Sequence, residues 1–419
     1  MTMPRMIRIR QRFEAPVVDD VAGEVERQIE ALQLASEVTP GQSVAVACSS
    51  RGIANYAEVA SSVVAGLKRL GLDPFLVPAM GSHGAASAEG QQRVLEAYGL
   101  TADRVGVPIR SSLDVDRIGE TPDGLPVCID RHARRADHIV LINRIKQHTE
   151  FEHEIESGLM KMLGIGLGKA EGAALYHKAI MVYGYPRVIT TVAHTVLQTG
   201  KILFGVGLVE NGFAQTARIA VTPADTLEVT EKKALKLAKK LAPRLPFEEA
   251  DVLVIDEMGK DISGAGFDTK VVGRILMPLL AEEPSSPRIK RIVVCDLTDK
   301  TAGNADGIGI ADFCTRRLVD KIDFCALHAN ALAGAEPEHA RIPLALDTDR
   351  CAIQAAIDSV GLIPAEELKV IRIRNTMQLD RMQVSSAYLE VARQSEHLEI
   401  LGPPELLAMD EEGNLRPLD

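Results

Sequence analysis

The chain has 419 residues, of which 46% are apolar and 25% charged, and its net charge is −11 at pH 7. Because one hydrophobic core rarely grows beyond roughly 250–300 residues, this length predicts two globular domains, and the negative charge argues against a nucleic acid partner. No run of about 18 apolar residues occurs, and the basic start lacks an apolar segment, so we expect a cytoplasmic protein with no membrane contact. The six cysteines show no CxxC spacing, which is typical of reduced thiols.

Short β-branched runs alternate with helical segments in the first part of the chain. The predicted elements are an edge strand at 6–13, a helix at 21–34, a buried strand at 43–50, a helix at 56–72, a strand at 73–81 and a helix at 87–100 with Ser87 as its N-cap. This order contains a β-α-β unit. The loop 81–86 therefore joins the carboxyl end of a strand to a helix, a place where ligands bind in open α/β sheets.

The alternation of strands and helices continues to the end of the chain. We predict two strands in 125–145, a helix at 185–200, strands at 202–212 and 215–223, a lysine-rich solvated helix at 226–246, and further α/β segments at 250–259, 288–298, 312–322, 355–362 and 368–376. The predicted fold class is therefore α/β, with two α/β domains, mainly parallel sheets and an active-site cleft between them. We place the N-terminal cofactor-binding and catalytic domain at 1–247. The C-terminal domain, 248–419, is expected to close the cleft, and its last residues have the freedom to pack back on the first domain.

Histidine, lysine and glycine concentrate in the stretch 143–178, which follows a predicted strand. Its chemically notable residues are His148, His153, Lys161 and His177, set among Gly158, Gly164, Gly166, Gly168 and Gly172. Glycine lets the backbone come close to a bound molecule. Lys161 lies between two methionines, and a lysine in apolar surroundings becomes a usable nucleophile or covalent anchor; a snorkelling lysine at a helix start is the alternative.

Two other positions lie at predicted strand ends. His83 stands in a glycine-flanked loop, where its imidazole can reach a ligand and transfer protons near neutral pH; a turn with an incidental histidine is the alternative. Arg51 follows the strand 43–50 and suits a carboxylate or phosphate, or else a surface ion pair.

Two familiar patterns do not explain the stretch. In Gly164-x-Gly166-x-Gly168 the third glycine does not have the spacing of a dinucleotide fingerprint, and the segment lacks the preceding strand and the acidic residue about 20 residues later. The spacings of His148, His153 and His177 match neither HExxH nor Cys/His zinc sites.

The motifs together resemble the nickel-dependent lactate racemase family, over roughly residues 40–215. In that family a Gly-Thr/Ser-His loop and a later Pro-His motif supply two catalytic histidines. A Ser-Gly-Gly-x-Lys motif supplies a lysine joined to a nickel-pincer nucleotide, and a histidine sixteen residues further on ligates nickel. Here the matching segments are Gly81-Ser82-His83, Gln147-His148 and Ser157-Gly158-x-x-Lys161, and His177 stands sixteen residues after Lys161.

The resemblance implies a role for each matching residue. It makes His83 and His148 the acid/base pair, His177 the nickel ligand and Lys161 the covalent attachment of nickel(II) pyridinium-3,5-bisthiocarboxylic acid mononucleotide. The remaining expected contacts are Ser82, Ser157 and Gly158 for the cofactor and Arg51 and Lys146 for the substrate.

The chain also departs from the family pattern. Ser-Gly-Leu-Met-Lys replaces Ser-Gly-Gly-x-Lys, Gln147 replaces proline, and the interval from His148 to Lys161 is about three residues longer, which leaves His153 as a competitor for the second base. These departures indicate a divergent subgroup.

The implied activity is an isomerase, a racemase or epimerase that inverts C2 of a 2-hydroxy acid by reversible hydride transfer to the cofactor. Polar residues crowd the site stretch, namely Asn143, Arg144, Lys146, Glu152 and Glu154, and favour a sugar acid such as an aldonate. The alternatives are a nicotinamide-dependent oxidoreductase of a small hydroxy acid and a cofactor-free relative with another activity. The expected partner is a small molecule, and the sequence leaves a homo-oligomer open.

Overall fold

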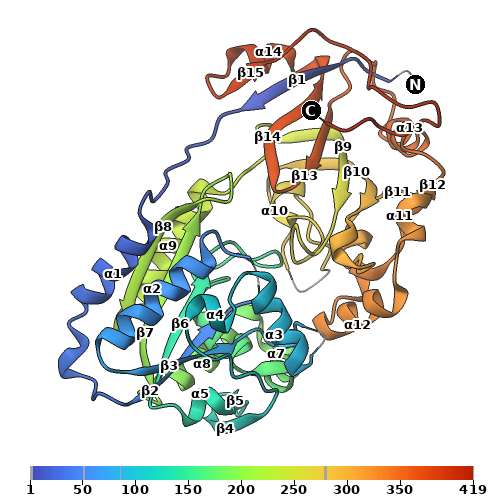
Figure 1. Cartoon of the computed structure of the whole chain (residues 1–419). Helices are drawn as coiled ribbons and strands as arrows, with labels where there is room; N and C mark the ends of the chain where they lie inside the picture. The colour runs from blue at the N-terminus through green and yellow to red at the C-terminus, as the bar shows by residue number, and fades with distance from the viewer. Residues whose placement is uncertain (1–2, 51, 85, 278–280, 419) are drawn as a thin grey trace. The chain divides into compact units, whose positions relative to one another are not determined.

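The computed structural model describes residues 3–50, 52–84, 86–277 and 281–418. Within it the chain divides into two units. The N-terminal unit is Ala15–Ala242, and the C-terminal unit combines Met1–Glu14 with Pro243–Asp419 (Figure 1). No helix among the described residues is long and apolar enough to cross a membrane.

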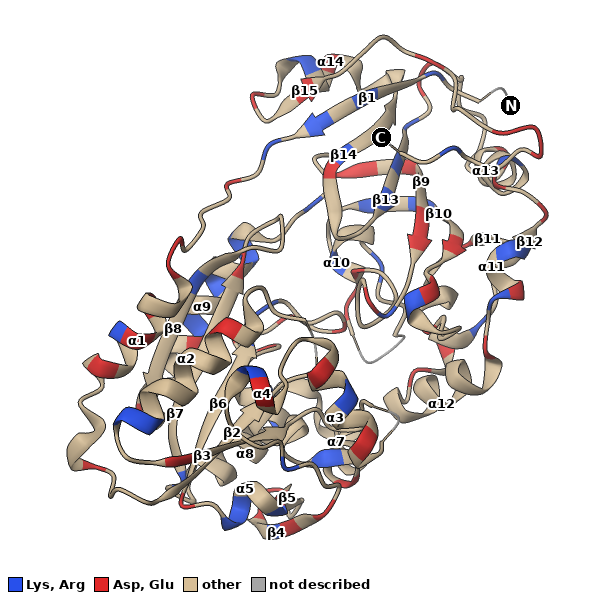
Figure 2. Ribbon diagram, in the orientation of Figure 1, with Lys and Arg blue, Asp and Glu red and all other residues tan. Residues whose placement is uncertain are grey.

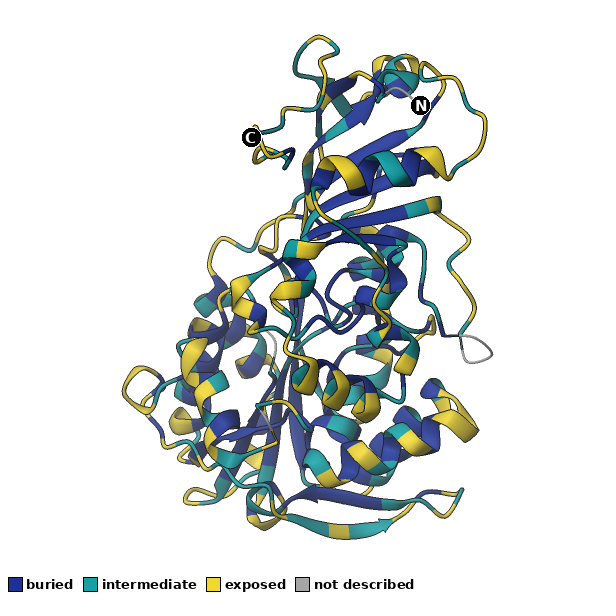
Figure 3. Ribbon diagram, turned by 90° about the vertical axis from the view of Figure 1, so that its right-hand side faces the viewer, coloured by how far each residue is buried: buried dark blue, intermediate teal, exposed yellow. Residues whose placement is uncertain are grey.

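A five-stranded sheet in the order β3-β2-β6-β7-β8 forms the centre of the N-terminal unit. Its strands are β2 (Ser43–Cys48), β3 (Asp73–Pro78), β6 (His138–Arg144), β7 (Ile202–Glu210) and β8 (Thr216–Pro223). All are parallel except β8, which runs antiparallel to β7. Parallel strands are covered on both faces, which explains why β2 and β6 read as continuous apolar runs. Figure 3 shows the buried strands with exposed residues on the surrounding helices.

The helices of this unit connect and cover the strands. They are α1 (Val21–Ala31), α2 (Tyr56–Arg69), α3 (Ala88–Ala97), α4 (Ala102–Val105), α5 (Arg131–Arg135), α6 (Leu159–Lys161), α7 (Lys169–Tyr183), α8 (Tyr185–Leu197) and α9 (Leu227–Leu241). A separate ribbon pairs β4 (Val115–Glu120) with β5 (Pro126–Asp130). The predicted α/β class is confirmed, and so is Ser87 as an N-cap, because its hydroxyl accepts a hydrogen bond from the backbone N–H of Gly90 at 3.0 Å.

The C-terminal unit has a mixed eight-stranded sheet in the order β12-β11-β10-β9-β13-β14-β1-β15. Its strands are β1 (Met6–Gln11), β9 (Glu249–Met258), β10 (Arg288–Leu297), β11 (Phe313–Thr315), β12 (Leu344–Leu346), β13 (Val370–Asn375), β14 (Gln378–Ser385) and β15 (Leu398–Ile400). The helices are α10 (Thr269–Val272), α11 (Arg316–Asp320), α12 (Phe324–Gly334), α13 (Asp349–Asp358) and α14 (Leu389–Gln394). The first five strands in that order are parallel, and the last three pair antiparallel.

Two predicted elements differ from the structure. The first strand is not an edge strand, because β1 pairs with β14 on one side and β15 on the other, with Ile7 and Ile9 fully buried. The helix α9 is not simply solvated, because one face buries apolar side chains and Glu231. In both cases the sequence pattern correctly predicts the strand or helix itself. It does not show which other parts of the chain pack against that element.

Candidate active site

The carboxyl ends of three adjacent parallel strands carry the predicted site residues of the N-terminal unit. Ser50 follows β2, His83 follows β3, and His148 follows β6. The hydroxyl of Ser50 lies 2.5 Å from Nδ1 of His83. Loops from neighbouring strands therefore bring separate motifs together at one edge of the sheet, as expected for a ligand site in this fold class.

The loop that carries His83 has a conformation that depends on glycine. Gly81 and Gly84 have φ angles of +57° and +68°, in the left-handed region that disfavours other residues. The side-chain amide of Gln91 donates to the carbonyl oxygens of Gly81 and His83, at 2.8 and 3.2 Å. The backbone N–H of Gly81 in turn donates to the carbonyl of Gly166 at 3.1 Å, so this loop rests on the segment that follows Lys161.

Lys161 ends the short helix α6, and a π-helical turn, Met162–Gly166, follows it at once. Turns of this type are often found at functional sites. A Cβ atom on Gly166 would lie 2.7 Å from the carbonyl oxygen of Ala79, so glycine is needed for this close approach. Lys161 is partly exposed, whereas Met160 and Met162 are buried, so the ammonium or amine end of the lysine is available to a ligand.

His148 is buried, and its Nε2 atom contacts Nζ of Lys161. Its ring stacks on Phe151 with centroids 4.3 Å apart and lies 5.4 Å from the ring of Tyr185. Burial lowers the pKa of His148 well below its ordinary value, and a positive charge on Lys161 would lower it further. The imidazole is therefore neutral at physiological pH.

The remaining predicted site residues differ in whether they lie close to His148. Lys146 and His177 lie close enough to His148 for their charges to lower its pKa further. Ser157 and Lys146 form a backbone bridge, at 2.8 and 3.2 Å, that closes the loop between them. By contrast, His153 is exposed and is not among the groups that shift the pKa of His148. Ser82 is partly exposed in the His83 loop, and Arg51 lies outside the described residues.

Two buried carboxylates that sequence reasoning missed hold the site loops. Glu156 accepts from the backbone N–H groups of His148 and His153, at 2.6 and 3.1 Å, and forms an ion pair with Lys239 of α9 at 2.6 Å. Glu231, also on α9, accepts from the backbone N–H of Met160 at 2.9 Å and so caps the helix that ends in Lys161. A Cβ atom on Gly158 would lie 2.5 Å from this carboxylate, which explains the glycine there.

A buried lysine, also missed from the sequence, connects the His83 loop to α7. Lys169 is fully buried and has a positive φ of 54°, which is unusual for a residue with a side chain. Its Nζ donates to the carbonyl of Pro78 at 2.5 Å and to Oε1 of Gln91 at 3.1 Å, and it lies 3.0 Å from Oδ2 of Asp130. Since Gln91 also binds the His83 loop, Lys169 fixes that loop and the start of the helix carrying His177 together.

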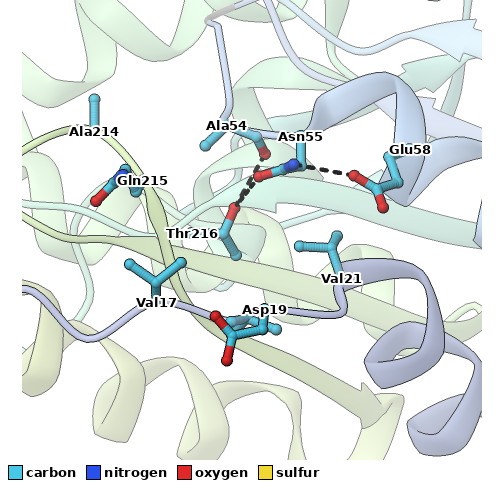
Figure 4. A pocket seen from close by; sticks show the side chains of 10 residues that line it. Val17, Asp19, Val21, Ala54, Asn55, Glu58, Ala214, Gln215 and Thr216 are labelled. Atoms are coloured by element: carbon cyan, nitrogen blue, oxygen red, sulfur yellow. Dashed lines mark hydrogen bonds between the residues drawn. The ribbon is translucent and has the colours of Figure 1, made fainter.

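A pocket of 390 Å³ lies elsewhere in the N-terminal unit (Figure 4). It is lined by Val17, Val18, Asp19, Val21, Ala54, Asn55, Glu58, Ala214, Gln215 and Thr216. None of the predicted site residues that the structure describes lines this pocket. Among the described residues no cluster of three or more His, Cys, Asp or Glu side chains could hold a metal ion.

Charged residues also lie at strand ends in the C-terminal unit, where Figure 2 marks acidic residues in red at the ends of β9 and β10. Asp256 binds the guanidinium of Arg372 through two hydrogen bonds of 2.8 Å. Lys260 lies 2.6 Å from the carboxylate of Asp306. These pairs give the strand-end charges a structural explanation within the unit.

The fold and the site define the N-terminal unit as an α/β domain with a histidine and lysine site at the carboxyl edge of its parallel strands. The family model of the lactate racemase N-terminal domain matches residues 6–185. Over those residues the chain is similar to the lactate racemase N-terminal domain, which confirms the resemblance carried by the motifs.

Among the similar solved structures is the lactate racemase apoprotein from Thermoanaerobacterium thermosaccharolyticum. The identity is 12%, the TM-score is 0.44, and the match covers 68% of this chain and 69% of that chain. No curated protein matches the sequence.

Replacing Glu156 with alanine should destabilise the protein by about 2–4 kcal/mol, because two backbone N–H groups and Lys239 lose a buried partner. Glu152 provides a matched control, since it pairs with the same lysine at 3.4 Å but its side chain is 73% exposed. Glu152→Ala should cost less than about 1 kcal/mol. Urea unfolding measures both values, and equal losses would contradict the role assigned to Glu156.

Burial raises the pKa of Glu231 to about 7, above its ordinary value of 4.5. A carboxyl whose pKa is raised by folding stabilises the native state below pH 4.5, and this contribution is lost as the pH rises through 7. Glu231→Gln retains an acceptor for Met160 but does not ionise. Relative to wild type, the variant should therefore gain up to about 3 kcal/mol in unfolding free energy between pH 4.5 and 8. If the difference in unfolding free energy between the variant and wild type did not change with pH, the raised pKa of Glu231 would be excluded.

Proposed function

We propose that this protein is a racemase or epimerase that inverts C2 of a 2-hydroxy acid. The family match supports a racemase-type enzyme, an isomerase. The observation that carries the finer proposal is the contact between His148 and Lys161, at the same sheet edge as His83. This contact places His148, a group suited to proton transfer, beside Lys161, the lysine expected to hold the cofactor.

The support for a nickel-pincer nucleotide is the pair of side chains that the resemblance requires. Lys161 is partly exposed and contacts His148, and His177 lies close enough to His148 to affect its pKa. In the proposal Lys161 holds the nucleotide covalently, Ser82, Ser157 and Gly158 contact it, and His177 donates an imidazole nitrogen, a common nickel ligand. The cofactor, when bound, supplies the hydride acceptor for C2.

The protein's own groups then handle the substrate's proton and carboxylate. One histidine accepts the hydroxyl proton while the C2–H bond breaks, and the other serves the opposite face, so both hands of the substrate react. Arg51 and Lys146 are proposed to hold the carboxylate, which keeps C2 in place while the planar keto acid turns. Phe151 and Tyr185 pack against His148, and burial keeps its imidazole neutral.

Four of the five polar residues that favour a sugar acid have partners within the protein. Asn143 donates to the carbonyl of Gly158 at 2.7 Å, and Arg144 forms an ion pair with Glu210. Glu152 and Glu154 are exposed and pair with lysines of α9. The charge of Lys146 acts on His148. The proposal is therefore a 2-hydroxy acid, with an aldonate as one candidate to be compared with lactate.

Protein produced together with the cofactor's biosynthetic enzymes should contain nickel and a covalent adduct on Lys161. Lys161→Ala should lose the adduct. His177→Ala should keep the adduct but retain much less nickel. Lys178→Ala is the control, since Lys178 is an exposed lysine on the same helix as His177. Intact mass and metal analysis measure both. Wild-type protein with neither nickel nor adduct would exclude the cofactor assignment.

His83→Ala and His148→Ala should each slow exchange of the C2 hydrogen by about 10²–10⁴-fold per bound nickel, because general acid or base catalysis contributes that much. The measurement is deuterium incorporation into a panel of 2-hydroxy acids, including lactate and aldonates. His153→Ala is the matched control on the same loop and should remain active. An active His148→Ala variant and an inactive His153→Ala variant would reverse our choice of base.

A further inference from the structure

The two ring nitrogens of His148 have different neighbours. Nδ1 lies 3.1 Å from the backbone N–H of Glu150, which points its hydrogen at the ring. Nε2 contacts Nζ of Lys161. A backbone N–H can only donate, so Nδ1 must present a lone pair and cannot carry a proton.

This contact fixes where the proton of the ring lies. A charged imidazolium carries a hydrogen on both nitrogens and would place one against the Glu150 N–H, so His148 is neutral. A neutral imidazole has one N–H, which must then be on Nε2. The ring therefore donates a hydrogen bond toward Nζ of Lys161.

We propose that His148 holds Lys161 as an uncharged amine in the cofactor-free protein, and so prepares it as a nucleophile. An ammonium has three donors and no acceptor, so it would set hydrogen against hydrogen at this contact, whereas an amine offers its lone pair. The rings of Phe151 and Tyr185 flank His148, and burial keeps its imidazole neutral.

An uncharged Lys161 would react with activated acyl or thioacyl groups. Nζ attacks the acyl carbon, the bond to the leaving group breaks, and the leaving group departs with that electron pair and one proton from nitrogen. The amide that forms has an N–H but no basic lone pair, so it can no longer accept from Nε2 of His148. Attachment would therefore end the hydrogen bond between His148 and Lys161. A later role of His148 in the reaction with substrate rests on the proposed function.

The test is competitive acetylation of the cofactor-free protein with limiting acetic anhydride at pH 7, read for each lysine by peptide mass spectrometry. An ordinary lysine, with a pKa near 10.4, has only about one molecule in 2,500 uncharged at this pH. Lys161 should therefore react at least about 10-fold faster than the exposed Lys178, although it is less exposed. The readout needs neither nickel nor substrate, so it is independent of racemase activity.

His148→Phe keeps an aromatic ring but removes the N–H, and should lower the ratio of Lys161 to Lys178 by about 10-fold. His153→Phe, on the same loop but exposed, should leave the ratio unchanged. A Lys161 that reacts no faster than Lys178, or as fast in His148→Phe as in wild type, overturns the proposal. If His148→Phe does not fold, the wild-type ratio decides alone.

Discussion

The buried ammonium of Lys169 is the interaction on which the site depends. Its three neighbours come from the end of β3, from α3 and from the end of β5, and it stands itself at the start of α7. Through Gln91 it also sets the loop of His83. Burial lowers the pKa of Lys169, and Asp130 opposes that shift. One charged group far from solvent thus fixes both the loop of His83 and the start of α7, the helix that carries His177.

A second constraint comes from α9, which holds the opposite side of the site. Glu231 caps α6 and Lys239 pairs with Glu156, which in turn binds the backbone of the His148 loop. Buried charges are costly unless paired and hydrogen-bonded, so such groups have defined positions. The loop from His148 to Ser157 has no regular structure of its own, and these contacts explain how it can present a histidine at a fixed place.

The sequence predicted the strand ends and the His83 loop because those features are local. Glycine at 81 and 84, Ser87 as a cap and the apolar runs of β2 and β6 each act within a few residues. The contributions of Glu156 and Glu231 were not predictable in the same way, since a glutamate in a loop or amphipathic helix usually faces water. The position of β1 was missed for a related reason, because alternation shows that a strand has a buried face but does not identify its partners.

Lys161 and Lys169 show why sequence alone could not separate the two lysines of the glycine-rich stretch. Each lies within the glycine-rich stretch and has an apolar residue beside it. Lys169 is surrounded by oxygen acceptors, which match the three donors of an ammonium, whereas the described contact of Lys161 is with a ring nitrogen that carries hydrogen. The charge state of a buried lysine is set by whether its neighbours accept or donate. The same side chain, eight residues apart, can therefore serve as a structural cation in one place and as a nucleophile in the other.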